Sequence, residues 1–183
     1  MDNGSAEHSE QICKNEKIID FTNGALTEFL IKLSAKIDGK DEKIIGSYFH
    51  VLNDLERIGD HAENFHEIGI EMINKNISFS EQALKGIIYM RDNVMKMFEI
   101  SVDTFEKLNK NRLFELTELE ESVDKMKKQL IASHFERLAE GNCSVDVSPY
   151  YSSVVTGLER IADHLVNVGF SIINPVGSQK KNN

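Results

Sequence analysis

Tryptophan is absent from this sequence of 183 residues, which also has only two cysteines and two prolines. Cys13 and Cys143 stand alone, without a Cys-x-x-Cys element, so we expect a reducing compartment and no disulfide framework. Pro149 and Pro175 lie where a helix can begin or end without being interrupted. The chain is therefore free to form long helices.

The sequence also has no apolar run approaching the ~18 residues that span a bilayer, and no signal-peptide segment at its N-terminus. We therefore expect a soluble, cytoplasmic chain. Basic residues are scattered and the net charge is −9, so cations are expected partners and nucleic acid is not. Neither a glycine-rich phosphate loop nor a nucleophile–base set is present, so we expect no enzymatic activity.

Apolar residues make up 40% of the chain and recur mostly at gaps of three and four residues, which is the period of packed α-helices. The predicted fold class is therefore all-α. Capping and helix-breaking residues divide the pattern into five helices. They span about residues 10–36, 41–74, 79–110, 112–140 and 149–174.

The sequence also predicts caps for two of these helices and a buried face for one of them. Gly39 is the expected C-terminal cap of the first helix, and Ser78 with Glu81 has the spacing of a capping box before the third. The third helix is expected to bury its most regular apolar stripe, which is Leu84, Ile87, Ile88, Met95, Phe98, Val102 and Phe105.

One motif, L-E-R-I-x-D-H-x-x-N, occurs at residues 55–64 and again at residues 158–167. The offset of 103 residues is too long for a solenoid repeat and fits a duplicated unit of several helices. Upstream of each copy, at nearly the same distance, lies a further E-x-x-x-D element, at residues 16–20 and 120–124. The chain therefore reads as an internal duplication.

The duplication divides the chain into four segments. Residues 1–9 are expected to be a disordered start or residues foreign to the native protein. Residues 10–76 form a first half of two helices, and residues 77–175 a second half of three. A polar tail follows over residues 176–183. The first half lacks a counterpart of the helix at residues 79–110.

The four E-x-x-x-D elements are the candidate metal site. Carboxylates four residues apart share one helix face and repel by about 3 kcal/mol at ~6 Å before solvent screening, a cost that a bound cation reverses. Without these eight residues, the 30 acidic side chains fall to 22, close to the 21 basic ones. Carboxylates suit hard divalent or trivalent ions, including a multinuclear iron, manganese or zinc cluster. The candidate ligands are Glu16, Asp20, Glu56, Asp60, Glu120, Asp124, Glu159 and Asp163.

Other interpretations stay open at this point. The carboxylates could be solvated charges of a metal-free helical adaptor. Glu63 and His66 match the Glu-x-x-His element of di-metal oxidoreductases, although that class needs a second copy, which the sequence lacks. The arginine of each repeated motif is expected to pair with nearby carboxylates, and its histidine to lie on the surface or pack. The motif's asparagine could ligate a metal or satisfy backbone groups.

With its hallmark motif at residues 55–64 and 158–164 and the upstream element at residues 120–124, the chain resembles the PhoU family. The resemblance covers residues 10–174 and implies a tandem three-helix bundle whose first helix is missing or short. More narrowly, residues 133–141 resemble the cytosolic PhoU-like domain of bacterial sodium/phosphate cotransporters.

The resemblance implies a regulator of phosphate uptake rather than an enzyme. It would bind a membrane phosphate transporter, in cis or in trans, or a sensor kinase, at the inner face of the membrane. The missing first helix would leave an apolar face uncovered, which favours a fragment of a larger protein or a homodimer.

Overall fold

The computed structural model describes residues 3–37 and 42–173. Within them the chain forms five α-helices and two short 3-10 turns, with no strand, so the all-α prediction is confirmed. The elements are α1 (Asn3–Ser34), α2 (Glu42–Asn74), α3 (Glu81–Lys107), η1 (Lys110–Arg112), α4 (Leu113–Ala139), η2 (Val145–Val147) and α5 (Ser148–Phe170).

The helix boundaries agree with the sequence to within a few residues, except at the N-terminus. α1 begins at Asn3, inside the segment for which we expected no structure. This segment contains no proline, and a helix that has already formed extends without needing an apolar stripe. The expected cap at Gly39 and the tail at residues 176–183 lie outside the described residues. α5 ends at Phe170, before the end that we expected near Pro175.

Local chemistry explains the ends of the second-half helices. The N-cap of α3 is Ser80 rather than Ser78, and its hydroxyl accepts a hydrogen bond from the Ala83 amide at 3.3 Å. α3 ends at Lys107, and Leu108, its C-cap, has a left-handed backbone (φ 51°). Pro149 lies in the first turn of α5, where its missing N–H is not needed.

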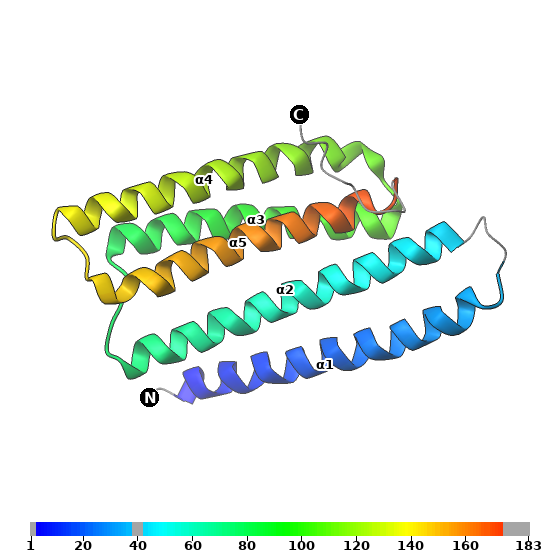
Figure 1. The fold of residues 1–183 in the computed structure, drawn as a ribbon, viewed down its shortest axis with the longest axis horizontal. Coiled ribbons are helices and arrows are strands. Elements are labelled where there is room, and N and C mark those ends of the chain that lie inside the picture. The colour runs from blue at the N-terminus through cyan, green and yellow to red at the C-terminus, as the bar shows by residue number, and fades with distance from the viewer. Residues whose placement is uncertain (1–2, 38–41, 174–183) are drawn as a thin grey trace.

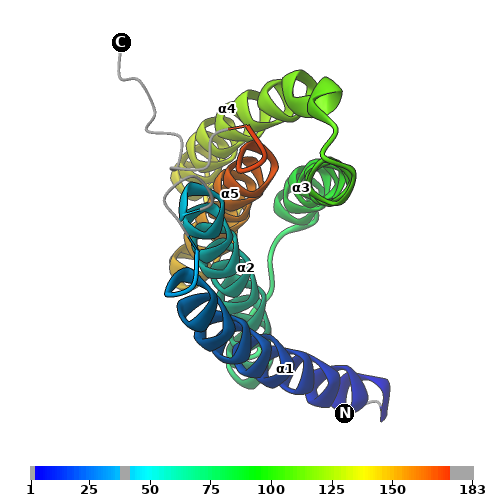
Figure 2. The ribbon, with the colours of Figure 1, turned by 90° about the vertical axis from the view of Figure 1, so that its right-hand side faces the viewer.

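α4, α5, α2 and α1 lie side by side in a curved layer in which each helix runs antiparallel to the next, and α3 packs on one side of this layer, parallel to α5 (Figure 1). α3, α4 and α5 pack on one another as a three-helix bundle, α2 packs on α5, and α1 packs on α2. Seen end-on, α1 and α2 extend away from the bundle like an arm (Figure 2). α5 is the central helix because it contacts α2, α3 and α4. None of the described helices is long and apolar enough to cross a membrane.

The main core lies between α3, α4 and α5. Its largest fully buried side chains are Tyr151, Met90, Met97, Ile100, Leu116, Leu165, Val123 and Val155. The predicted stripe of α3 is largely wrong, because Leu84, Ile88, Met95 and Phe98 are 37–52% exposed. α3 is apolar on two faces, and the face that carries Met90 and Met97 is the one that packs on the bundle.

The arm formed by α1 and α2 leaves large apolar side chains in solvent. On α1, Phe21 is 78% exposed, Phe29 58% and Ile18 53%. Because α1 packs on α2, the other sides of α1 stay uncovered in the single chain. This agrees with the expectation that the first half lacks a covering helix.

A buried polar group joins the end of α4 to the start of α5. His134, which is 2% exposed, stacks on Tyr151 at 4.6 Å between ring centroids, and its Nε2 lies 3.0 Å from the Ser148 hydroxyl. The Arg137 guanidinium also lies over the Tyr151 ring, 5.4 Å from its centroid. Burial, followed by the Arg137 charge, lowers the pKa of His134 below its ordinary value. His134 and Arg137 therefore help to hold the end of α4 against the start of α5.

Gly157 on α5 permits the close approach of α2. A Cβ at this position would lie 2.6 and 2.9 Å from ring atoms of Phe65. We expect Gly157→Ala to cost about 1–3 kcal/mol, because the ring would have to move within a packed interface. Urea denaturation followed by circular dichroism measures this loss.

Gly24 in α1 provides the matched control. A Cβ there would meet no atom within 4 Å, so Gly24→Ala should stabilise the helix by up to about 1 kcal/mol. If both substitutions changed stability in the same direction, the close α2–α5 contact would be contradicted.

Candidate functional site

Three of the predicted ligands meet where α4 packs against α5. Glu120 and Asp124 lie one turn apart on α4, and Asp163 faces them from α5. One carboxylate oxygen from each lies within 4.8 Å of the others, and all three side chains are half-buried. Among the described residues, this is the group of His, Cys, Asp and Glu side chains that could hold a metal ion. We refer to it as the acidic trio.

Proximity makes the acidic trio electrostatically costly. Two carboxylates about 5 Å apart repel by ~3 kcal/mol at an effective dielectric of ~20, before solvent screening. A divalent or trivalent cation bound between the three would replace this repulsion by attraction. Since all donors are carboxylate oxygens, the group fits hard ions such as Mg²⁺, Mn²⁺ or iron.

Glu159 lies one turn before Asp163 on α5 but has a different partner. Its Oε2 is 2.9 Å from the Lys127 ammonium on α4, and its side chain is 18% exposed. The ion pair compensates the charge of Glu159, so this carboxylate does not need a metal ion for neutralisation.

In the first half, the motif on α2 is organised differently. Arg57 donates to Asp60 at 3.3 Å, and its Nε lies 3.9 Å from the Glu56 carboxylate. The prediction that the motif arginine pairs with nearby carboxylates is therefore confirmed for Arg57, whereas Arg160 forms no such ion pair among the described residues. The pairing leaves Glu56 and Asp60 compensated by an arginine.

The remaining two predicted ligands, Glu16 and Asp20, lie next to each other on α1. A hydrogen bond with Asp20 raises the pKa of Glu16 above its ordinary value, helped by desolvation and by the charges of Asp20 and Glu63. Glu16 is half-buried and Asp20 exposed. Glu63 therefore lies near Glu16 and Asp20. The acidic trio contains no histidine, and the Glu63–His66 element of the oxidoreductase interpretation is not part of it.

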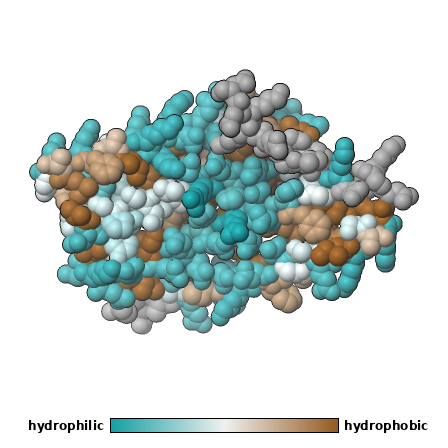
Figure 3. Space-filling model, viewed as in Figure 1, coloured by the Kyte–Doolittle hydropathy of each residue, from teal (hydrophilic) through white to brown (hydrophobic). Residues whose placement is uncertain are grey.

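A polar groove runs along the surface where α2 packs on α5. Its two parts have volumes of about 510 and 470 Å³ and share Asp60, His61 and Arg160. The first part is also lined by Asn64, Ser152, Ser153, Thr156 and Gly157, and the second by Arg57, Asp163, His164 and Asn167. In space-filling view the middle of this face is strongly hydrophilic (Figure 3).

The two motif histidines meet in this groove. The rings of His61 and His164 lie 6.1 Å apart. Burial, followed by the positive charges of His164 and Arg160, lowers the pKa of His61 below its ordinary value. His164 Nδ1 lies 2.7 Å from Asp54 Oδ1, which also accepts from the Asn167 amide at 3.3 Å. Asp54 is 7% exposed and thus forms a buried polar link from α2 to α5.

Comparison with known proteins identifies the family of this chain. The family model described as the PhoU domain matches residues 1–68 and 87–172. The chain belongs to the PhoU domain family.

Two curated relatives of this PhoU chain carry related names. A "Phosphate-specific transport system accessory protein PhoU homolog 1" from Thermotoga maritima is 26% identical over 167 residues, which is 90% of this chain and 71% of the relative. A "Phosphate-specific transport system accessory protein PhoU homolog" from Clostridium acetobutylicum is 27% identical over 168 residues, covering 90% of this chain and 75% of the relative.

A solved structure supports the PhoU fold. The crystal structure of PhoU from Pseudomonas aeruginosa superposes with a TM-score of 0.83 at 20% identity, covering 92% of this chain and 80% of that one. At 20% identity, this match is evidence for the fold and not for the function. It agrees with the predicted tandem three-helix bundle.

The structure brings together some of the predicted ligands of this PhoU domain, and it also shows polar residues that the sequence did not point to. Asp54 lies two residues before Glu56 but outside the repeated motif. Lys127 was missed because an ion pair between helices depends on their relative register, which one sequence does not give. Metal binding by the eight carboxylates stays a prediction, and the structure concentrates it on the acidic trio.

Proposed function

We propose that this PhoU-family chain is a metal-binding regulatory domain that controls phosphate uptake. Its acidic trio would bind a divalent or trivalent ion, and the domain would act by contacting a membrane phosphate transporter or its sensor kinase. The observation that carries the metal proposal is the convergence of Glu120, Asp124 and Asp163 within 4.8 Å. The phosphate proposal draws on the two relatives, which are named accessory proteins of a phosphate-specific transport system.

Each residue of the acidic trio has a defined task in this proposal. Glu120 and Asp124 present two oxygens from one face of α4, and Asp163 supplies the third from α5. A metal ion there would supply positive charge and fix the two helices relative to each other. Glu159 stays with Lys127 and orders the adjacent turn.

The uncovered apolar surface of the arm favours a protein partner. Phe21, Phe29 and Ile18 are all more than half exposed. An apolar surface of this kind usually marks a place where another protein binds. We propose that a second copy of the chain, or a neighbouring segment of a larger transporter protein, covers it. The cotransporter-like segment at residues 133–141 supports an arrangement in cis.

Elemental analysis of protein purified without chelator or nickel resin tests the metal proposal. We expect at least one iron, manganese, zinc or similar ion per chain. The Glu120→Gln plus Asp163→Asn variant should lose it, because a single remaining carboxylate is a weak ligand set. At a free metal concentration 100 times its Kd, the wild-type chain should gain about 2.7 kcal/mol of stability, and the variant much less.

Glu118→Gln is the matched control, because Glu118 is an exposed carboxylate on the same helix. It should retain the metal. Metal-free wild-type protein whose melting temperature ignores added Mn²⁺, Fe²⁺ and Zn²⁺ would contradict the metal proposal. A metal-free helical adaptor would then be the better description.

A further inference from the structure

The arginine, histidine and asparagine of both repeated motifs line the groove between α2 and α5, and the metal proposal uses none of them. They are Arg57, His61 and Asn64 on α2, and Arg160, His164 and Asn167 on α5. All six can donate hydrogen bonds. Because the two copies face each other across the groove, the duplication allows one side of it to be compared with the other.

On one side of the groove, the donors already have an acceptor. The buried carboxylate of Asp54 on α2 lies 2.7 Å from His164 Nδ1 and accepts from the Asn167 amide at 3.3 Å. An anionic group of the protein thus occupies the point where the histidine and asparagine of this copy converge.

On the other side, the equivalent donors have no such acceptor. The offset of 103 residues pairs Asp54 with Gly157, which has no side chain. The ring of Phe65 packs where a Cβ of residue 157 would lie. His61 and Asn64 therefore face α5 across the part of the groove that measures about 510 Å³. Within the described residues, neither of them has a hydrogen bond to a carboxylate of α5.

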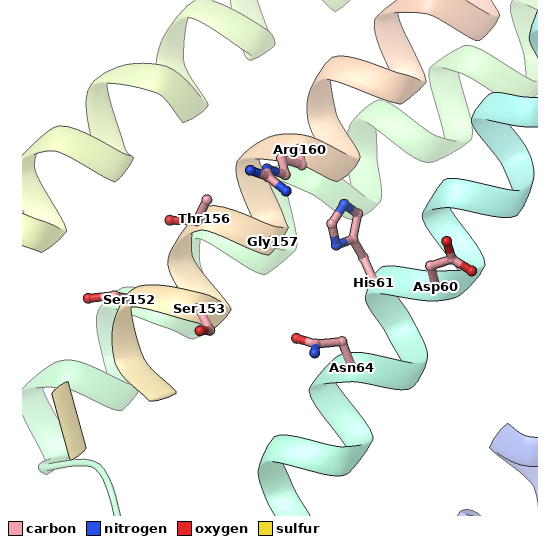
Figure 4. A pocket seen from close by; sticks show the side chains of 8 residues that line it. All are labelled: Asp60, His61, Asn64, Ser152, Ser153, Thr156, Gly157 and Arg160. Atoms are coloured by element: carbon pink, nitrogen blue, oxygen red, sulfur yellow. The ribbon is translucent and has the colours of Figure 1, made fainter. Parts of the chain in front are cut away.

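The charges around this part of the groove favour an anion. Within the described ranges, Arg160 makes no ion pair, unlike Arg57, which is bound to Asp60. In the close-up view, His61 and Asn64 point from α2 toward α5, where Arg160 and Ser153 lie, and Asp60 points away from α5 (Figure 4). An arginine beside an imidazole, an amide and a hydroxyl is a donor set suited to several oxygens of one anion.

We propose that this side of the groove binds a tetrahedral oxyanion of the phosphate class, which takes the role that the Asp54 carboxylate has on the other side. Arg160 supplies the positive charge, and His61, Asn64 and Ser153 supply neutral donors. The ligand is inorganic phosphate or the phosphate of a monoester. The anion bridges the two halves of the duplication, so its binding stabilises the packing of α2 on α5.

Isothermal titration calorimetry tests the proposal on the metal-free chain of 183 residues, in chloride buffer of constant ionic strength. Metal-free protein keeps the result separate from the metal proposal. The two probes are inorganic phosphate and glycerol phosphate. We expect saturable binding of one anion per chain and at least a tenfold loss of affinity in Arg160→Gln. Tighter binding of inorganic phosphate identifies the free ion as the ligand, and tighter binding of glycerol phosphate identifies a monoester.

The internal duplication supplies matched controls. Asn64→Ala should weaken binding, whereas Asn167→Ala, at the equivalent position already bonded to Asp54, should leave the affinity within about twofold. Arg91→Gln controls for net charge, because Arg91 is an exposed arginine on α3 paired with Asp92. Absence of saturable binding with both probes would overturn the proposal. So would equal affinities of the Arg160→Gln and Arg91→Gln variants, or equal losses in the two asparagine variants.

Discussion

Leu165→Ala should destabilise this protein by about 2–5 kcal/mol, the usual cost of emptying a buried leucine site. Leu165 is 1% exposed, and it lies on α5, the helix that α2, α3 and α4 all contact. A cavity there cannot be filled by collapse of one neighbour alone. For a chain of this length, the melting temperature should fall by roughly 4–20 °C. Urea denaturation and a thermal melt measure both quantities.

Leu84→Ala removes the same atoms from an exposed site. Leu84 is 45% exposed on α3, so its loss should cost less than about 1 kcal/mol. Similar losses in the two variants would show that α5 is not the centre of the core.

Asp54→Ala should cost about 1–3 kcal/mol, a large effect for a single polar side chain. The substitution removes the acceptor of His164 and Asn167 and leaves two partly buried donors in the α2–α5 interface. Asp54→Asn should cost less, because it keeps one acceptor oxygen and the size of the side chain. Chemical denaturation of the three proteins at one pH orders them.

Asp92→Ala controls for the loss of an aspartate as such. Asp92 is exposed and pairs with its neighbour Arg91, so its removal should change stability by no more than about 0.5 kcal/mol. A double-mutant cycle between Asp54→Ala and Asn167→Ala should give a coupling of at least about 0.5 kcal/mol. Strict additivity would mean that the 3.3 Å contact contributes nothing.

The acidic trio was predictable because its geometry is mostly local. Glu120 and Asp124 share a helix face by their spacing alone, and the repeated motif indicated that Asp163 belongs to the neighbouring helix. To predict the trio, it was therefore enough to assume that two consecutive helices pack on each other. The neutralisation of Glu159 by Lys127 was not predictable, because it depends on how far α4 slides along α5.

The buried face of α3 shows a second limit of the sequence. α3 carries two apolar stripes, and the more regular one, with Leu84 and Met95, is the one left partly in solvent. Helical periodicity shows that a stripe exists, but the partner helix decides which stripe is buried. The less regular stripe, with Met90 and Met97, fits against α4 and α5.

The role of the motif histidines and asparagines could have been found from the differences between the two copies. The identical positions drew attention to the carboxylates. The pairing of Asp54 with Gly157 lies just outside the motif, at a position where the copies differ. Duplicated units that face each other need not keep the same contacts, and a carboxylate present in only one copy marks a place where the two halves differ.

The packing of α1 on α2, at the far end of the arm, has a consequence for the motions of the chain. A helix that buries one side against one neighbour can open without disturbing the bundle of α3, α4 and α5. Backbone amides of α1 therefore exchange with solvent through a local opening that costs less than global unfolding. A partner that covered Phe21 and Phe29, as proposed above, would add its binding free energy to the cost of that opening.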